Sequence, residues 1–366
     1  MTNWGFAFTA SVLISTGAVP GPVIADPAGH DTAVMQVRDS LDRINRMDPQ
    51  YRAVIALDAA GALADAATQD AMTPAERAQL PLAGSLVLVK DNIAVRGAPT
   101  TAGSLALATN HSGRDAQLVA QLRAAGALLL GKTNLSEWAN FRSEHSISGW
   151  SAVGGQTRNA IDWERSPCGS SSGSAVAIAL GYAEIAIGTE TNGSIVCPAA
   201  VNGVVGFKPT QGLVSGEGIV PLATSQDTAG PITETVAQAA LTLSVIAKPD
   251  YPGVARGLLE HDSQPDLRGI RIGVLGNSLG FDRRRDAAVN EVTAIAAGDG
   301  AELQHGLTLT PYPGFQEDAY AVLLYEVRRD IADYFAGLGN DLAGWDLDRL
   351  IAFNKDHAEE ELKHFD

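Results

Sequence analysis

Cysteine is scarce in this chain, with two residues among 366. Cys168 and Cys197 are too few for a disulfide framework, and their spacing does not match a metal-binding motif. Cysteine that carries no special chemistry usually behaves as a small buried apolar residue, and we favour that interpretation for both. The sequence therefore predicts two free thiols and no metal centre.

Basic residues are also few, because 26 Lys and Arg stand against 42 Asp and Glu, for a formal net charge of -16. Binding to nucleic acid relies on clustered basic side chains, so this balance argues against such a partner. The share of hydrophobic residues, 45%, and of charged residues, 19%, is that of a folded globular protein. A small or peptidic molecule is the expected partner.

Charged residues are absent from residues 1–25. The apolar stretch from Phe6 to Val19 is too short to span a bilayer, and Val23 to Ala25 resembles a signal cleavage site. No basic residue precedes the stretch, so a buried N-terminal segment is the alternative. We expect residues 1–25 to be a signal peptide and the mature protein to be periplasmic or secreted; without cleavage it would be cytoplasmic. No membrane association is expected.

Helix and strand patterns alternate along the rest of the chain, which predicts an α/β sheet covered by helices. Apolar residues from Val34 to Ile44 recur at helical spacing, Tyr51 to Leu57 is expected as a strand, and the continuous apolar run Leu86 to Val89 is typical of a strand buried on both faces. Further helices are expected at 115–125, 172–180, 234–246, 287–297, 316–338 and 347–364, and further strands at 127–130, 183–187, 204–207 and 270–275.

Two familiar motifs occur in contexts that do not suit them. Gly126 to Thr133 satisfies GxxxxGK[ST], but its four intervening residues are themselves expected as a strand, whereas a phosphate cradle needs an open loop. Gly169 to Gly173 satisfies GxSxG with Ser171 as its serine, but polar, irregular sequence precedes it where a buried strand is required. We therefore disfavour nucleotide binding and an α/β-hydrolase site.

Two other serines lie in glycine-framed turns. Ser170 belongs to Cys-Gly-Ser-Ser-Ser-Gly-Ser, which opens a predicted helix, although the same composition occurs in flexible linkers. Ser194 follows a predicted strand, and the backbone N–H groups of Thr191, Asn192 and Gly193 before it could converge on a carbonyl oxygen as an oxyanion hole. A glycine-serine turn by itself is common.

A nucleophilic serine requires a base, and the seven histidines form no recognisable Ser-His-Asp arrangement; His145 is the nearest in sequence. Lys90 is the better candidate, because it ends an apolar strand where desolvation favours the neutral amine. A lysine that simply reaches solvent from a strand end is the alternative.

Several blocks in order, among them PLAGSLVLVKDNI, CGSSSGSAVA, GTETNGSIVCPA and SQDTAGP, resemble the amidase signature family. The resemblance implies Ser194 as nucleophile, Ser170 as bridging serine and Lys90 as base, with a cis peptide bond between Gly169 and Ser170. It further implies a central mixed β-sheet covered by helices on both faces, one catalytic domain over residues 26–366, and no cofactor or metal. Relatives are expected to continue past the end of this chain, so we interpret the chain as C-terminally truncated relative to the family.

Other blocks, such as GTETNGSIVCPAAVNGVVG and LLYEVRRDIADYF, resemble bacterial peptide amidases, which cleave the C-terminal amide of peptides. This resemblance implies a peptide carboxamide substrate, contact of Asn192 with it, and a monomeric enzyme. A broad amidase acting on small or aryl amides and an inactive truncated paralogue that binds peptides remain alternatives. Val196, where many members carry Arg, and the acidic charge argue against a transamidosome component that acts on charged tRNA.

Overall fold

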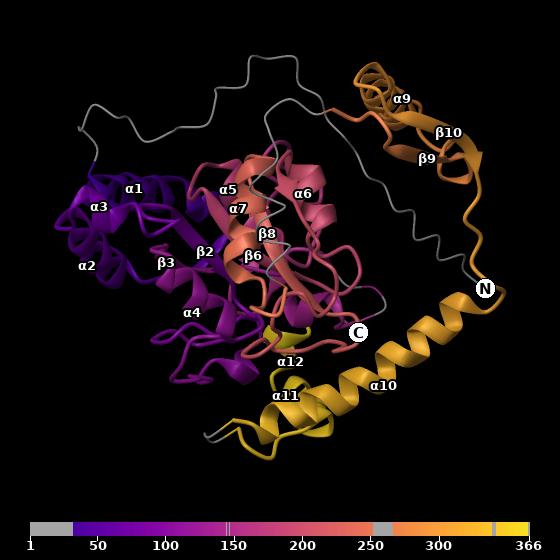
Figure 1. Cartoon of the computed structure of the whole chain (residues 1–366). Helices are drawn as coiled ribbons and strands as arrows, with labels where there is room; N and C mark the ends of the chain where they lie inside the picture. Colours follow the sequence, from indigo (N-terminus) through magenta and orange to yellow (C-terminus); the bar gives the residue numbers. More distant parts are fainter. Residues whose placement is uncertain (1–31, 144, 146, 252–265, 339–341, 365–366) are drawn as a thin grey trace. The chain divides into compact units, whose positions relative to one another are not determined.

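The computed structural model of this chain describes residues 32–143, 145, 147–251, 266–338 and 342–364 (Figure 1). The expected signal peptide, residues 1–25, lies outside the described residues. By their contacts, the described residues fall into two compact units, one of residues 266–322 and a larger one of residues 32–251 and 323–364 apart from the gaps above. The interval 26–366, expected as one catalytic domain, thus contains both units.

A six-stranded mixed sheet forms the centre of the larger unit, in the order β1-β3-β2-β6-β8-β7. Strand β2 is parallel to both β3 and β6, whereas the pairs β1/β3, β6/β8 and β7/β8 are antiparallel. The sheet consists of β1 (Val54–Leu57), β2 (Leu86–Lys90), β3 (Leu128–Thr133), β6 (Ile185–Glu190), β7 (Val205–Gly206) and β8 (Thr228–Thr233). The α/β class and the mixed sheet expected from the sequence are confirmed.

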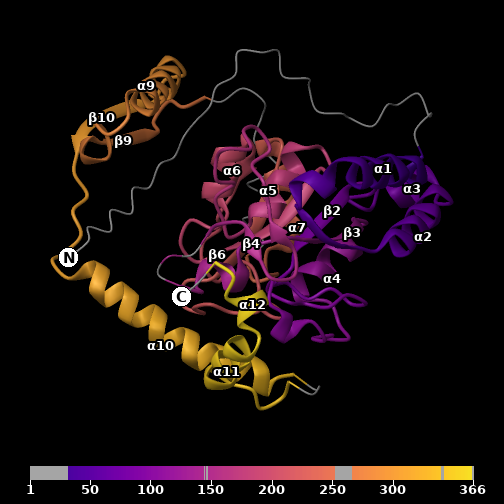
Figure 2. The ribbon, with the colours of Figure 1, turned by 180° about the vertical axis from the view of Figure 1, so that it is seen from behind.

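Helices cover both faces of this sheet (Figures 1 and 2). In β2, Leu86 and Leu88 face one apolar cluster while Val87 and Val89 face the other, because successive strand side chains point to opposite faces. The first cluster is closed by α1 (Ala33–Tyr51), α2 (Ala59–Asp70), α5 (Ser172–Ala179) and α6 (Val196–Asn202), and the second by α4 (Gln117–Ala124) and α7 (Val236–Ile246). The short helix α3 (Pro74–Arg77) and the two-stranded ladder of β4 (Trp150–Ser151) and β5 (Gly155–Gln156) lie outside the sheet.

A third apolar cluster joins the C-terminal helices to the larger unit. Val327, Ile331 and Phe335 of α10 (Phe315–Ala336) pack in one cluster with Leu107 and Val220. Two further helices follow, α11 (Leu347–Asp356) and α12 (Ala358–Glu361). Burial of these aromatic and branched side chains, at about 25 cal/mol per Å² of apolar surface, stabilises the docking.

A buried ionic cluster fixes α12. Glu361 Oε1 accepts hydrogen bonds from the Leu105 N–H (2.6 Å) and Ser104 Oγ (3.0 Å). Arg142 bridges two carboxylates, with Nη2 3.3 Å from Glu361 Oε2 and Nε 3.4 Å from Glu137 Oε1. Burial, and then the charge of Glu361, raise the pKa of Glu137 to about 9. The pairing of Glu361 and Arg142 therefore ties residues more than two hundred positions apart in the chain.

The smaller unit is a strand-helix-strand unit of β9 (Arg271–Leu275), α9 (Arg283–Gly298) and β10 (Glu302–Leu307). Its two strands pair in parallel, as a helical crossover requires. Asp282 caps α9 by accepting the Arg284 and Arg285 N–H groups. Across the described part of the chain, none of the helices is both long and apolar enough to cross a membrane.

Candidate active site

Lys90 ends β2 with its side chain fully buried. Its Nζ donates hydrogen bonds to Ser170 Oγ (2.7 Å), Thr189 Oγ1 (2.7 Å) and the Thr189 carbonyl oxygen (3.2 Å). The contact with Ser170 arises because β2 and β6 are parallel neighbours and the turn before α5 lies at the ends of both. The lysine expected from sequence and the bridging serine are therefore in direct contact.

Burial controls the protonation of this lysine. Desolvation lowers the pKa of Lys90 from 10.5 to about 7, although the nearby charges of Asp227 and Glu190 act in the opposite direction. A large share of the side chain is then the neutral amine near neutral pH. A neutral amine beside a hydroxyl can accept its proton, which an exposed lysine could not do.

Ser170 lies in the turn that opens α5, and its side chain is fully buried. The Gly169–Ser170 peptide bond is cis, as the resemblance implied. The Ser170 carbonyl oxygen accepts the Ser136 N–H at 2.9 Å, and the Ser172 hydroxyl donates to the Cys168 carbonyl oxygen at 2.6 Å. These bonds tie the turn on both sides of Ser170 and hold its hydroxyl toward Lys90.

Ser194 occupies the turn between β6 and α6, and 8% of its surface is exposed. Its carbonyl oxygen accepts the Ser171 N–H at 3.0 Å, so the two serine turns touch directly beside Ser170. Gly193 before it has a φ of +88° and open space at its Cβ position, a backbone conformation that favours glycine. The two turns separated by 24 positions in the sequence thus meet in space.

Glu190 holds the Ser194 turn in shape. One carboxylate oxygen accepts the Gly193 N–H (2.8 Å), and the other accepts the N–H groups of Ile195 (2.7 Å) and Val196 (3.0 Å). The carboxylate therefore caps the N-terminus of α6, where a negative charge is favourable. No function was expected of Glu190 from the sequence, where it stands only as a departure from the common family form.

The three expected oxyanion donors lie together in this turn, but their N–H groups differ. The Gly193 N–H already donates to Glu190, whereas the structure records no partner among the described residues for the N–H groups of Thr191 and Asn192. Asn192 is exposed, as a substrate-contacting side chain must be. Thr191 Oγ1 donates to Asp227 Oδ1 at 2.5 Å, which connects the turn to the SQDTAGP block.

Asp227 is a site residue that was not expected from the sequence. Its second oxygen accepts the N–H groups of Leu222 (2.8 Å) and Ala223 (2.9 Å), and burial raises its pKa while the bonds to Thr191 and the backbone oppose the rise. Its presence in a block that resembles the family was the available signal. Nothing local in the sequence indicated that its charge acts on Lys90.

Cys168 and Cys197 form a disulfide, with Cα atoms 5.9 Å apart. The prediction of two free thiols was therefore wrong. The pairing joins the turn of Ser170 to the helix that follows Ser194, and the two cysteines come together because both serine turns do. Two cysteines 29 positions apart in otherwise ordinary sequence give no sign of this contact.

The disfavoured motifs remain disfavoured. Lys132 of the GxxxxGK[ST] match lies within β3, fully buried, with its Nζ 2.8 Å from Asp91 Oδ1, so it faces no phosphate loop. Ser171 is fully buried, and its hydroxyl exchanges hydrogen bonds with the Thr189 backbone (3.1 and 3.2 Å). His145 is exposed. Within the described ranges, no three His, Cys, Asp or Glu side chains gather as metal ligands would.

Comparison with known proteins agrees with this architecture. A family profile described as Amidase matches residues 36–363. The native peptide amidase of Stenotrophomonas maltophilia is 44% identical with a TM-score of 0.82, and the match covers 92% of this chain and 71% of that one. An amidase family protein from Bacillus anthracis is 32% identical with a TM-score of 0.80, covering 92% and 68% respectively.

Curated relatives extend the likeness. A glutamyl-tRNA(Gln) amidotransferase component from Symbiobacterium thermophilum is 41% identical over 285 residues, which are 76% of this chain and 57% of that protein. A putative amidase of Arthroderma benhamiae is 34% identical over 349 residues, 91% of this chain and 59% of that protein. The chain thus spans under three fifths of the length of these two relatives.

Proposed function

Because this chain belongs to the amidase signature family, we propose that it hydrolyses carboxamides, and that its substrate is the C-terminal amide of a peptide. The observation that carries the hydrolytic part is the 2.7 Å contact of buried Lys90 with Ser170, with a lysine pKa of about 7. The likeness to a peptide amidase at 44% identity supports the choice of substrate.

In the proposed reaction Ser194 Oγ attacks the amide carbonyl carbon, and its proton passes through Ser170 to neutral Lys90. The N–H groups of Thr191 and Asn192 are directed at the oxyanion, and Gly193 can join them by sharing its bond with Glu190. The proton returns from Lys90 through Ser170 to the leaving nitrogen as the carbon-nitrogen bond breaks, and ammonia leaves. Water then attacks the acyl-enzyme along the same proton path, which releases the free acid and restores Ser194.

Ammonia release from a short C-terminally amidated peptide by the full chain tests this function, with mass spectrometry of the product. Ser194→Ala should abolish release, while Ser244→Ala, which removes a hydroxyl bonded only to its own helix, serves as the matched control. The product should be heavier than the substrate by the exchange of an amide for an acid, with peptide bonds intact. Release that persists in Ser194→Ala contradicts the proposal.

Broad amidase activity on small or aryl amides is the second candidate, favoured by the similarity to generic amidases. Relative kcat/KM values on a peptide amide and on simple aliphatic and aryl amides separate the two. A preference for the simple amides by tenfold or more would replace the peptide proposal.

We also propose that the protein acts outside the cytoplasm. The Cys168–Cys197 disulfide supports this, because disulfides persist in oxidising compartments. N-terminal sequencing of protein recovered from the periplasm or medium is the test. Cleavage near Ala25 is the expected result, and an intact Met1 in exported protein would contradict the expected signal peptide.

A further inference from the structure

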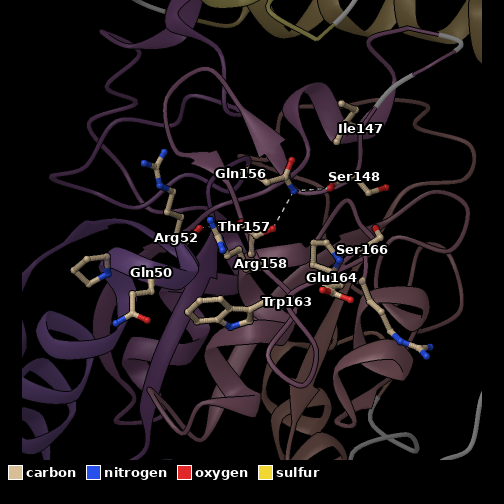
Figure 3. A pocket seen from close by; sticks show the side chains of 13 residues that line it. Gln50, Arg52, Ile147, Ser148, Gln156, Thr157, Arg158, Trp163, Glu164 and Ser166 are labelled. Atoms are coloured by element: carbon tan, nitrogen blue, oxygen red, sulfur yellow. Dashed lines mark hydrogen bonds between the residues drawn. The ribbon is translucent and has the colours of Figure 1, made fainter.

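A cavity of about 760 Å³ opens beside the Ser170 turn (Figure 3). Its lining comes from residues 49, 50 and 52 at and after the C-terminal end of α1, and from parts of the segment 147–167. The volume is in the range of small-molecule and peptide sites. Nothing in the proposed reaction uses this cavity.

Positive charge dominates the lining. Arg52, Arg158 and Arg165 line the cavity with a single carboxylate, Glu164. Arg165 pairs with Asp162 at 3.1 Å, whereas Arg52 and Arg158 make no ion pair with any residue that the structure describes. On a chain with a net charge of -16, this is a local inversion of sign that favours an anionic ligand.

The two unpaired arginines are held in place by neighbouring bonds. The Arg158 N–H donates to the Tyr51 carbonyl oxygen (2.9 Å), and Thr157 Oγ1 donates to the Arg52 carbonyl oxygen (2.8 Å), so both arginines extend from one hydrogen-bonded pair of segments. The Arg158 guanidinium lies 5.0 Å above the ring of Trp163, whose other contact is the edge of Tyr51 at 5.5 Å. A guanidinium stacked on a ring loses less freedom when it binds a carboxylate.

Guanidinium groups are the main hydrogen-bond donors that the cavity offers. Figure 3 shows the Gln156 amide nitrogen bonded to the carbonyl oxygens of Ser148 (3.0 Å) and Thr157 (2.9 Å), which uses both of its N–H groups. A ligand group with several acceptor oxygens therefore suits the cavity better than a neutral donor. Carboxylate is the acceptor group that arginine binds in a two-pronged geometry.

The cavity is connected to the catalytic turn. Thr157 in its lining donates its N–H to the Gly149 carbonyl oxygen (2.8 Å), Gly149 donates to Ser136 Oγ (2.7 Å), and Ser136 donates to the Ser170 carbonyl oxygen (2.9 Å). Pro167, which also lines the cavity, lies three positions before Ser170. A peptide bound at Ser194 is thus in range of the cavity if it extends a few residues.

We propose that this cavity is a specificity subsite that binds the side-chain carboxylate of an acidic residue in the peptide substrate, upstream of the cleaved C-terminal amide, between Arg52 and Arg158. The inference rests on the proposed function and adds a preference for acidic peptides to it. Trp163 positions Arg158 and does not take part in the chemistry.

A scan of acidic position tests the subsite. Amidated peptides of one length carry a single Glu, or Gln as the neutral match, at each position from about the second to the seventh before the amide, which spans roughly 3.4 Å per residue. We expect kcat/KM for Glu over Gln to reach about tenfold at one spacing and to fall with added salt. In Arg52→Gln/Arg158→Gln this ratio should fall to near one, and Arg158→Glu should favour Lys at the same position. Arg114→Gln, which removes the same charge outside the cavity, should keep the wild-type ratio.

Binding separates failure of the subsite from failure of the function. Titration calorimetry with Ser194→Ala should give a lower Kd for the best Glu peptide than for its Gln match. If no peptide releases ammonia but this difference in Kd appears, the hydrolysis proposal fails and the subsite stands. If peptides are cleaved but Glu and Gln give equal kcat/KM and equal Kd at every spacing, the subsite is refuted.

Discussion

The protonation of Lys90 determines a specific pH dependence of the reaction. The shift of its pKa from 10.5 to about 7 corresponds to about 5 kcal/mol of lost stabilisation of the ammonium form. The side chain is fully buried, so solvent does not screen this effect. With a pKa of about 7, the neutral form would be about one tenth of the enzyme at pH 6, half at pH 7 and nine tenths at pH 8.

We therefore expect kcat/KM for ammonia release to rise about tenfold for each pH unit below 7 and to level off above pH 8, because kcat/KM reports groups of the free enzyme. Asp227→Asn should move the rise to lower pH, since the Asp227 charge raises the Lys90 pKa. Lys90→Met should reduce kcat by a factor of about a thousand or more.

Stability supplies the control for the lysine variant. A lysine whose folded pKa is depressed destabilises the fold fully below pH 7, and this penalty is relieved as the pH rises from about 7 to 10.5. Lys90→Met removes the penalty, so its melting temperature should not fall at pH 6. A rate that stays constant from pH 5.5 to 8, or half the wild-type rate in folded Lys90→Met, would refute the assignment of Lys90 as base.

Three further predictions concern groups around this centre. Glu190→Gln should lower kcat by roughly tenfold or more with little change in KM, because the loss of its charge loosens the turn it caps at Gly193; unchanged kcat would show that the cap is dispensable. Reduction of Cys168–Cys197, which closes a 29-residue separation, should lower the free energy of unfolding by roughly 3 kcal/mol in urea titrations, with the Ser/Ser double variant as reference, whereas equal midpoints would contradict it. Glu137→Gln should stabilise the protein at pH 8 by roughly 1–3 kcal/mol and not at pH 4: a folded pKa of about 9, above the ordinary 4.5, makes stability fall as pH rises through that interval, and denaturation at the two pH values decides.

Local sequence determined the elements and much of the candidate site. Apolar periodicity predicted the buried strand that ends at Lys90 and the helices that follow Ser170 and Ser194, because such patterns depend only on which face of an element is covered. The expected strand from Tyr51 begins instead at Val54, since α1 continues through Tyr51. Element boundaries depend on capping contacts that a pattern does not contain.

Only the tertiary structure decided which groups meet. The bond from Lys90 to Ser170 and the contact of the two serine turns were expected through the family resemblance, and the parallel pairing of β2 with β6 is what brings them together. The Cys168–Cys197 disulfide and the charge of Asp227 near Lys90 could not be read from the sequence. Periodicity reports burial, whereas pairing and pKa depend on distances between segments remote in the chain, and those distances exist only once the sheet and its turns have packed.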